Sequence, residues 1–429
     1  MQRTSNQSSN MTQIKRHIKD PLYRNSLFLI ANHVVMTGLG FVFWMVVARF
    51  YSEAEVGLGA AIISAISLLG LFSRLGLDIT LIRFLPKTDK PTELINSCLT
   101  LSGIVALAIA GIYIAGIGLW SPAMGFIRHN VIFSIAFVLF TIFWTLSGVV
   151  SLIFIAKRRA DFTLSKSTIY SLLKVPLPII LVIYFHTFGI VASWGLATGV
   201  ALAISVLLFL PRAQNRYKLV PKVNLGILKD VWRYSAGNYL ANLLGAAPGL
   251  ILPIMIVNLL GAAQNAYFYV AWMIAGLLFA IPGAISQTLF AEGSHFEVAL
   301  EVNVRRSYRF IFMLLIPAIV IVLLGGKWFL LIFGASYSAN ALMLLWILAA
   351  SSFFVGINSV YYSNLRVESR IRELVAIFVF VTLAVLVGSY FVTPITGIVG
   401  VGYVWIGARG LVSVYILLRM VRSYLRRRG

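Results

Sequence analysis

The chain alternates long apolar runs with short polar intervals, and each run is longer than the helix of an ordinary soluble core. Because about 20 apolar residues cover a hydrocarbon core of about 30 Å, runs of this length predict membrane-spanning helices. The pattern predicts an all-α integral membrane protein with about 12 transmembrane helices. The predicted helices span residues 26–48, 57–82, 95–119, 131–155, 168–185, 188–210, 234–258, 266–290, 309–332, 340–362, 372–392 and 397–419.

The longest polar interval, residues 211–233, falls at the middle of the chain and is rich in Lys and Arg. We interpret it as a cytoplasmic linker between two pseudo-symmetric six-helix lobes, since transporters often contain repeated helix bundles. The predicted parts are a basic cytoplasmic N-terminal segment at 1–25, an N-lobe at 26–210, the linker at 211–233, a C-lobe at 234–421 and a basic cytoplasmic tail at 422–429.

Short glycine motifs recur in the two halves. Gly125 pairs with Gly334, and Gly189 pairs with Gly397, at nearly equal offsets along the chain. A single match in so apolar a chain has little weight, but near-equal offsets at several places favour duplication of an ancestral six-helix unit.

Charged residues are few and unevenly placed. They make up 11% of a chain that is 60% hydrophobic, and 35 Lys and Arg against 13 Asp and Glu give a net charge of +22. In a membrane protein such an excess indicates basic cytoplasmic loops rather than a nucleic-acid partner. The predicted outer intervals hold only Arg49, Arg128 and Lys327. We therefore expect a multi-pass protein of the cytoplasmic membrane with both termini in the cytoplasm.

Motifs for cofactor chemistry are missing from the sequence. Cys98 is the only cysteine, so neither an intramolecular disulfide nor a cysteine-rich zinc site is expected. Gly325-Gly326-Lys327 lacks the upstream glycine of an ATP-binding P-loop. We expect no cofactor and no metal, and a driving force from an ion gradient, the membrane potential or the lipid gradient.

Two sequence runs have a familiar pattern. They are WMVVARFYSEAEVGLGAAIISAISLLGLFSRLGLDITLIRFLP at 44–86 and GGKWFLLIFGASYSANALMLLWILAAS at 325–351. In the second, Phe333-Gly334 and Tyr337 precede a helix rich in alanine and leucine. The chain resembles the polysaccharide-unit (oligosaccharide-lipid) flippase family of the multidrug/oligosaccharidyl-lipid/polysaccharide exporter superfamily, and the resemblance extends to the helix number and the two-lobe organisation.

The resemblance implies an alternating-access carrier, not an enzyme. Its substrate would be an anionic polyprenyl-(di)phosphate-linked oligosaccharide, moved from the cytoplasmic to the outer leaflet for synthesis of cell-surface polysaccharide or glycan. Membrane lipids and a coupling ion, H⁺ or Na⁺, are the other expected partners, and a two-lobed carrier of this kind is complete as a monomer.

A charge inside an apolar run is costly and usually faces protein or a water-filled cavity. Arg74 and Asp78 are four residues apart, which would place them on one face of the predicted second helix. One interpretation is an internal ion pair. The other is that Arg74 contacts substrate phosphate, while Asp78 orients it or exchanges a proton or Na⁺.

Two further cations lie inside predicted helices. Lys174 precedes Pro176 and Pro178, and its long side chain could snorkel to the cytoplasmic interface or line the transport path. Arg409 lies near the middle of the last helix, and we predict that it lines the substrate cavity, the alternative being a structural hydrogen-bonding role. Arg74, Lys174 and Arg409 against the single acid Asp78 favour an anionic substrate over a cationic drug.

Neutral polar residues complete the predicted transport path. Asn32 and His33 lie in the first helix, although a lone helical histidine is more often a packing residue than a proton carrier. Asn238 and Asn242 lie four residues apart on the seventh helix and could line the cavity or serve ordinary bundle packing.

Three alternatives stay open from the sequence. A multidrug cation antiporter of the same superfamily would need a cavity of the opposite charge. A membrane glycan polymerase or ligase would normally carry a larger outer loop than the intervals near 120–130 and 333–339. A purely structural membrane protein would have less need of an arginine within a helix.

Overall fold

The structure, a computed structural model, describes residues 21–293 and 300–428. The first 20 residues of the predicted N-terminal segment and Gly429 of the predicted tail lie outside this range. Within it, all regular elements are helical, and twelve helices are long and apolar enough to span a membrane, which confirms the all-α fold class. These spans are Arg24–Phe50, Glu53–Ser73, Pro91–Ala115, Val131–Ala156, Ala160–Ile183, Thr187–Ala213, Gly237–Leu260, Ala262–Ser286, Val304–Leu331, Ala335–Val367, Ile371–Thr396 and Ile398–Arg422.

The chain divides into two compact units. Among the described residues, unit 1 comprises 21–46, Leu69–Ala115 and Asn130–Ala236, and unit 2 comprises Val47–Leu68, Gly116–His129, 237–293 and 300–428. Most of the predicted N-lobe thus belongs to unit 1, and the predicted lobe boundaries themselves stay a prediction. Helices α2 (Pro21–Phe50), α3 (Glu53–Ser73) and α13 (Leu225–Leu260) contribute residues to both units.

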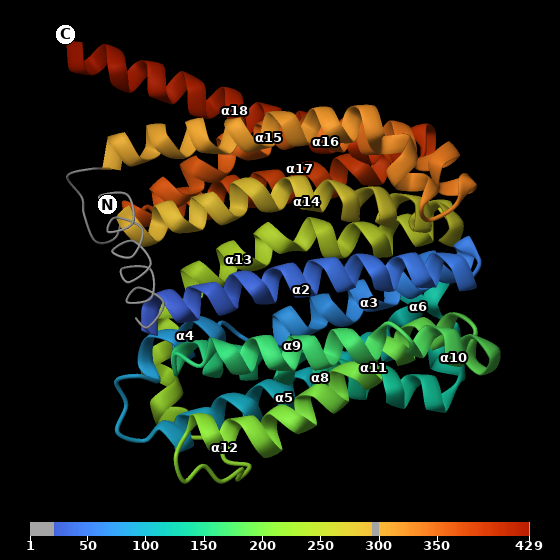
Figure 1. Ribbon diagram of the computed structural model, residues 1–429, viewed down its shortest axis with the longest axis vertical. Helices are drawn as coiled ribbons and strands as arrows, with labels where there is room; N and C mark the ends of the chain where they lie inside the picture. Colours follow the sequence, from blue (N-terminus) through green and yellow to red (C-terminus); the bar gives the residue numbers. More distant parts are fainter. Residues whose placement is uncertain (1–20, 294–299, 429) are drawn as a thin grey trace, which may run out of the picture. The chain divides into compact units, whose positions relative to one another are not determined.

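Unit 1 is built around α8, which packs against α4, α5, α9 and α11 (Figure 1). A π-helical turn at Ser205–Phe209 continues α11 into a short last helix. The helices of this unit are α4 (Leu77–Phe84), α5 (Pro91–Ala115), α8 (Val131–Ala156), α9 (Ala160–Lys174), α10 (Leu177–Phe185), α11 (Thr187–Ile204) and α12 (Leu210–Ala213).

Unit 2 is built around α16, which packs against α14, α15, α17 and α18 (Figure 1). Pro248 and Pro253 lie inside α13, yet this helix continues through both of them. The other helices of the unit are α6 (Ile117–Trp120), α7 (Phe126–His129), α14 (Ala262–Gly293), α15 (Leu300–Leu331), α16 (Ala335–Val367), α17 (Ile371–Thr396) and α18 (Ile398–Arg428), with a 3₁₀ turn at Pro122–Met124.

The predicted second helix is interrupted where its charges lie. Helix α3 ends at Ser73, and α4 begins at Leu77. Between them Leu75 has φ 52° and Gly76 has φ 74°, both in the left-handed region that breaks a right-handed helix. Arg74 and Asp78 are therefore not on one face of a continuous helix, and that expectation was wrong.

The predicted fifth helix begins earlier than its apolar run. Helix α9 starts at Ala160, eight residues before the predicted start at 168, because the segment ADFTLSKS is helical although it is polar. Its polar residues fall on the buried face, at Thr163, Lys166, Ser167 and Ser171. A segment predicted to be cytoplasmic loop is thus part of a membrane span.

The segment after α12 packs on the start of α5 within unit 1. The Tyr217 hydroxyl donates to Oδ1 of Asn96 at 2.8 Å, and Nδ2 of Asn96 donates to the carbonyl oxygen of Lys218 at 2.9 Å. Lys222 pairs with Glu93 at 2.9 Å. The part of the predicted linker that precedes α13 is therefore fixed to unit 1 by side-chain contacts.

The start of α3 is held closely against α14 within unit 2. Nδ2 of Asn265 donates to the carbonyl oxygen of Gly57 at 2.7 Å. A Cβ placed on Gly57 would lie 1.7 Å from the carbonyl oxygen of Ala262, so only glycine permits this approach. Near this contact, Ser336 donates to Glu53 at 2.6 Å, from the run that carries the Phe333-Gly334 motif.

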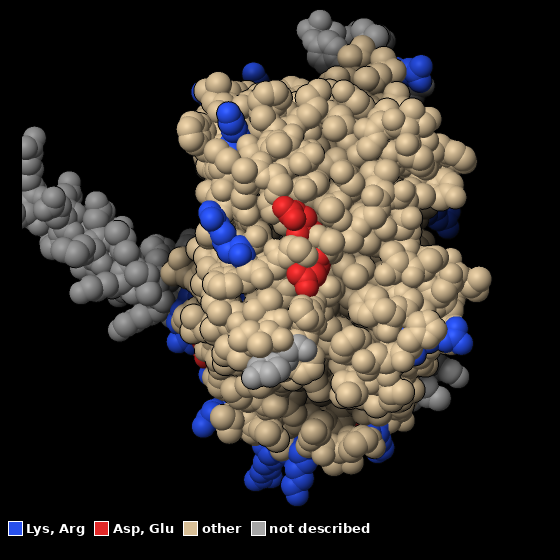
Figure 2. Space-filling view, turned by 90° about the vertical axis from the view of Figure 1, so that its right-hand side faces the viewer, with Lys and Arg blue, Asp and Glu red and all other residues tan. Residues whose placement is uncertain are grey.

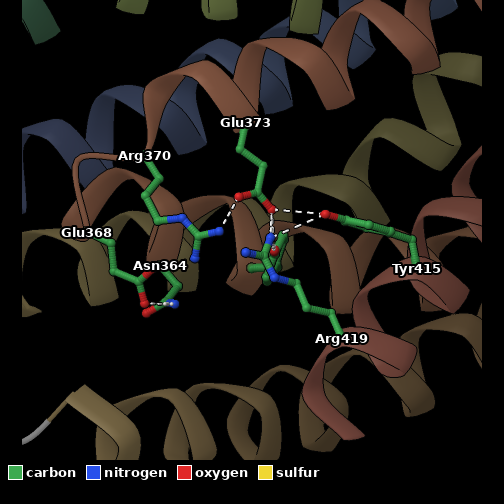
Figure 3. Close-up of polar contacts among 7 residues, drawn as sticks. Asn364, Glu368, Arg370, Glu373, Tyr415 and Arg419 are labelled. Carbon is green, nitrogen blue, oxygen red and sulfur yellow. Dashed lines mark hydrogen bonds and ion pairs between the residues drawn. The ribbon is translucent and has the colours of Figure 1, made fainter. Parts of the chain in front are cut away.

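A carboxylate joins three helices of unit 2. Glu373 of α17 accepts from Tyr361 of α16 at 2.6 Å and from Tyr415 of α18 at 3.3 Å, and it pairs with Arg370 and Arg419. Figure 3 shows both guanidinium groups pointing toward this carboxylate. The cluster ties together the ends of α16, α17 and α18.

The charged residues are sparse on the face drawn in Figure 2. Uncharged residues cover most of it, and Lys and Arg side chains are scattered singly or in small groups. A surface of this kind suits contact with lipid rather than with bulk water.

Candidate functional site

A cavity of about 240 Å³ lies within unit 1, and the apolar side chains of Leu29, Met36, Trp144 and Ile155 form part of its wall. Arg74 and Lys166 both line it, and they are its charged groups among the described lining residues. The other polar residues that line it are Asn32, Ser147, Ser151, Thr163, Ser167, Tyr170 and Thr198. The described lining thus combines two cations with neutral hydroxyl and amide groups.

Lys166 is buried in this cavity, with 6% of its surface exposed. Its ammonium donates to the carbonyl oxygen of Ser147 at 2.6 Å, to Oγ of Ser147 at 2.9 Å and to Oγ of Ser151. These three acceptors are neutral, so they satisfy the three N–H bonds without cancelling the charge. A buried, hydrogen-bonded cation of this kind attracts an anion strongly because little water screens it.

Arg74 enters the same cavity from the break between α3 and α4. It follows directly on the last residue of α3, where the negative end of the helix dipole favours a cation. Its guanidinium lies over Gly148 of α8, and a Cβ at Gly148 would fall 2.3 Å from Nη2. Arg74 and Lys166 line the same cavity. Two like charges held in one cavity repel each other, and a bound anion would relieve that repulsion.

The Lys174 side chain is buried rather than extended to the protein surface. It is 5% exposed, and its ammonium lies 4.5 Å from the ring centre of Tyr170 and 5.3 Å from that of Phe43. Its Nζ also donates to the Tyr170 hydroxyl at 3.4 Å. Aromatic faces attract cations, so these two rings hold the ammonium inside unit 1. Lys174 is not among the described residues that line the cavity.

Arg409 lies in unit 2, in the middle of α18. Its guanidinium stacks over Trp405 at 4.4 Å and lies beside the Tyr362 hydroxyl. Its carbonyl oxygen accepts from Asn358 at 3.1 Å and from Ser413 at 3.1 Å. These contacts place the side chain in an aromatic environment, and its role in a substrate cavity stays a prediction.

Of the remaining predicted site residues with described side chains, Asn32 joins Arg74 and the others lie elsewhere. Asn32 lines the unit 1 cavity, whereas the neighbouring His33 is exposed. In unit 2, Oδ1 of Asn242 accepts from Arg366 at 3.2 Å, and Asn238 is half-buried on the same helix. Asp78 lies in α4, and its side chain is outside the described part of the chain.

Lys166 is the main site residue that the sequence analysis missed. It lies in the interval between the helices predicted at 131–155 and 168–185, because the apolar run begins after it. A signal was present: Thr163, Lys166, Ser167 and Tyr170 recur at spacings of three and four residues. This is the spacing of one helix face, and a polar face within a membrane span indicates a cavity.

Among the residues that the structure describes, no group of three or more His, Cys, Asp or Glu side chains comes together as a metal site would require. The cavity in unit 1 offers hydrogen-bonding groups and positively charged side chains. Proteins use groups of both kinds to bind phosphate.

The architecture is that of known two-lobed transporters. It is similar to an inward-facing multidrug resistance MATE family transporter of the MOP superfamily, with a TM-score of 0.69 and 16% identity over 94% of this chain and 99% of that one. It is also similar to the lipid II flippase MurJ in an inward closed conformation, with a TM-score of 0.73 and 12% identity over 92% of this chain and 87% of that one. A MOP superfamily transporter from Pyrococcus furiosus matches with a TM-score of 0.64 and 17% identity over 95% of this chain and 96% of that one.

These matches and the twelve spans define a multi-pass membrane protein with a transporter fold. The model of the family described as polysaccharide biosynthesis protein matches residues 22–290, which is more than half of the chain, and the chain belongs to this family. The family expected from the sequence is thereby confirmed. No curated protein matches the chain in sequence.

Proposed function

We propose that the chain is a flippase of the cytoplasmic membrane, with both termini in the cytoplasm. It moves a polyprenyl-(di)phosphate-linked oligosaccharide from the cytoplasmic to the outer leaflet by alternating access. The observation that carries the proposal is the pair Arg74 and Lys166 in one cavity of unit 1. Family membership supports the connection with polysaccharide synthesis.

The charge of the cavity favours this substrate over a cationic drug. Keeping two cations in one partly buried cavity costs folding free energy, so their presence points to a use. A phosphate or diphosphate offers several oxygen acceptors to the arginine fork, and its negative charge is attracted to the Lys166 ammonium, whose N–H groups already bind Ser147 and Ser151. A cationic drug would be repelled by both groups.

The polar neighbours add hydrogen bonds without adding negative charge. Asn32, Thr163 and Ser167 line the same cavity and can donate to phosphate oxygens. At about 240 Å³ the cavity is small for a whole lipid-linked oligosaccharide, and it suits the phosphate part of the headgroup.

The test is a flipping assay with the full chain in phospholipid vesicles. The probe is a prenyl diphosphate that carries a disaccharide with a fluorescent label, and a membrane-impermeant quencher reports how fast the probe crosses the bilayer. We expect the wild-type protein to speed the crossing. Lys166→Met should slow it about tenfold, which corresponds to about 1.4 kcal/mol of lost interaction.

The matched control is Lys157→Met, which removes a lysine at the end of α8 that does not line the cavity. It should flip the probe at the wild-type rate. Lys166→Met should fold well, because an apolar side chain of similar length replaces a buried charge and Ser151 already donates to the Ser147 carbonyl at 3.1 Å. If Lys166→Met flips the probe as fast as the wild type, the cavity is not the anion site.

A further inference from the structure

A second cavity, of about 350 Å³, lies entirely within unit 2. It is formed between α3, α13 and α14, and it falls in the range of about 300–1,000 Å³ that is usual for small-molecule sites. Its described lining contains no Lys, Arg, Asp or Glu. Its ligand chemistry must therefore differ from that of the cationic cavity in unit 1.

One wall of this cavity is the indole ring of Trp272. The ring is fixed by aromatic neighbours: its centre lies 4.8 Å from that of Trp405 at 77°, 5.9 Å from Phe279 at 70° and 5.6 Å from Phe268 at 26°. Such packing keeps the indole in one orientation, so it can serve as a rigid stacking surface.

A glycine leaves room for a methyl group at the edge of the indole that faces α13. Gly249 lines the cavity, and a Cβ at this position would lie 3.5 Å from Cζ2 and 3.6 Å from Nε1 of Trp272. That is ordinary van der Waals distance, so alanine would fit there without strain. Because glycine is present, this space beside the indole stays empty of protein atoms.

Hydroxyl groups line the cavity alongside the indole. Ser64 and Ser67, three residues apart on α3, contribute two, and Tyr269, three residues before Trp272 on α14, also lines the cavity. Residues three apart share one face of a helix, so each helix presents its polar groups to the cavity together. Aromatic surface and hydroxyls thus meet in one uncharged site.

We propose that this cavity binds a neutral sugar ring. A pyranose has a face of polarised C–H bonds, which the negative face of an indole attracts, and a rim of hydroxyls, which serine and tyrosine hydroxyls can bind. A phosphate would find no cation among the described lining residues, and a prenyl chain has no group that could hydrogen-bond to the hydroxyls. The inference rests on the proposed function: the sugar is part of the same lipid-linked glycan.

The test compares two probes by titration calorimetry on the purified full chain in detergent. One is farnesyl diphosphate, and the other is farnesyl diphosphate that carries one N-acetylglucosamine. We expect the wild-type protein to bind the glycosylated probe five- to tenfold more tightly than the sugar-free one. In Gly249→Ala, whose new methyl group narrows the cavity at the Nε1 edge of the indole, this preference should fall below about twofold while the affinity for farnesyl diphosphate stays unchanged.

The matched control is Gly245→Ala on the same helix. Its Cβ would lie 3.6 Å from Phe378, also ordinary contact, and Gly245 does not line the cavity. This variant should keep the full preference. Trp272→Leu, which removes the aromatic surface, should lose the preference as Gly249→Ala does.

Other results would overturn the inference in distinguishable ways. Equal wild-type affinity for both probes, or a preference that survives in Gly249→Ala, would remove the sugar site and leave the proposed function standing. An equal loss of affinity for both probes in Gly249→Ala would assign the cavity to the prenyl chain. If the wild-type protein binds neither probe, the proposed function fails and the sugar site fails with it.

Discussion

The guanidinium of Arg74 lies directly over the backbone of Gly148, where a Cβ would fall 2.3 Å from Nη2 and 2.4 Å from Cζ. Gly148 thus makes the room in which the Arg74 charge reaches the cavity of unit 1. The neighbouring atoms belong to the end of a flexible side chain, so a methyl group would displace the guanidinium rather than the backbone.

We predict that Gly148→Ala folds normally and flips the labelled prenyl diphosphate probe several-fold more slowly than the wild type. This variant keeps the Arg74 charge and changes only the position of the guanidinium. The result therefore tests whether that position matters for flipping. The measurement is the flipping rate in vesicles together with the unfolding temperature. Gly103→Ala, whose Cβ would lie 3.7 Å from Leu146, is the control and should leave the rate unchanged.

The close approach of α3 and α14 within unit 2 predicts a strong effect on stability. In Gly57→Ala the added methyl group would meet the carbonyl oxygen of Ala262 at 1.7 Å, and backbone atoms cannot move aside. We expect a loss of about 3 kcal/mol or more in the free energy of unfolding. Thermal unfolding in detergent would measure it.

Gly276→Ala on α14 is the matched control, because no atom lies within 4 Å of its Cβ position. Alanine is the better helix former by about 1 kcal/mol, so this variant should be as stable as the wild type or slightly more stable. Equal unfolding temperatures for Gly57→Ala and Gly276→Ala would contradict the packing seen at Gly57.

Within its cluster, the carboxylate of Glu373 should contribute most to the stability of the folded protein. Glu373→Gln keeps the size of the side chain but leaves Arg370 and Arg419 without their shared counter-charge. We expect the free energy of unfolding to fall by about 1–2 kcal/mol. The loss is moderate because the guanidinium groups are partly exposed and solvent screens their charge. Unfolding by heat or denaturant provides the measurement.

Glu368→Gln offers a control in the same cluster. Glu368 pairs with Arg370 at 3.0 Å and accepts from Asn364 at 2.8 Å, but it contacts neither tyrosine and is 36% exposed. Loss of the Glu368 carboxylate should lower the free energy of unfolding by less than about 0.5 kcal/mol. A larger effect for Glu368→Gln than for Glu373→Gln would show that the cluster is not centred on Glu373.

The contact between Tyr217 and Asn96 predicts a dependence on pH. Burial raises the pKa of Tyr217 from its ordinary value of 10.0 to about 12. The unfolded chain therefore loses the phenolic proton at lower pH than the folded chain does. The stabilisation from this group is complete below pH 10 and disappears as the pH rises toward 12.

Tyr217→Phe cannot titrate, so its comparison with the wild type isolates this effect. We expect the wild type to be more stable by about 1–2 kcal/mol at neutral pH, and the difference should shrink as the pH rises from 10 toward 12. Thermal unfolding of both proteins across this range measures it. A difference that stays constant with pH would mean that Tyr217 does not titrate in this way.

The apolar pattern was sufficient to predict the membrane-spanning helices, because most of the outer surface of such a protein contacts lipid. It failed where a helix turns polar residues inward. The segment that starts at Ala160 is polar by composition, so Lys166 was taken for a loop residue although it faces the cavity. Arg74 was found because its surroundings in the sequence are apolar.

Local backbone geometry was the second feature that hydropathy could not show. Three residues are enough to end α3 and start α4, and their effect on mean hydropathy is negligible. Gly76 could have suggested a break, but a glycine inside an apolar run is common in membrane helices. The contacts of Lys174 with Tyr170 and Phe43 depend on tertiary packing, which the spacing of residues does not reveal.

The neutral surroundings of the Lys166 ammonium also bear on how fast such a carrier can work. Under the proposed function, a fixed positive centre that draws a phosphate out of one leaflet would hold it equally firmly against departure. Tight capture would then make departure the slow step of each cycle. Such a carrier would work fastest with an intermediate affinity for the phosphate. Substitutions at Ser147 and Ser151, the hydroxyl partners of Lys166, would change that affinity.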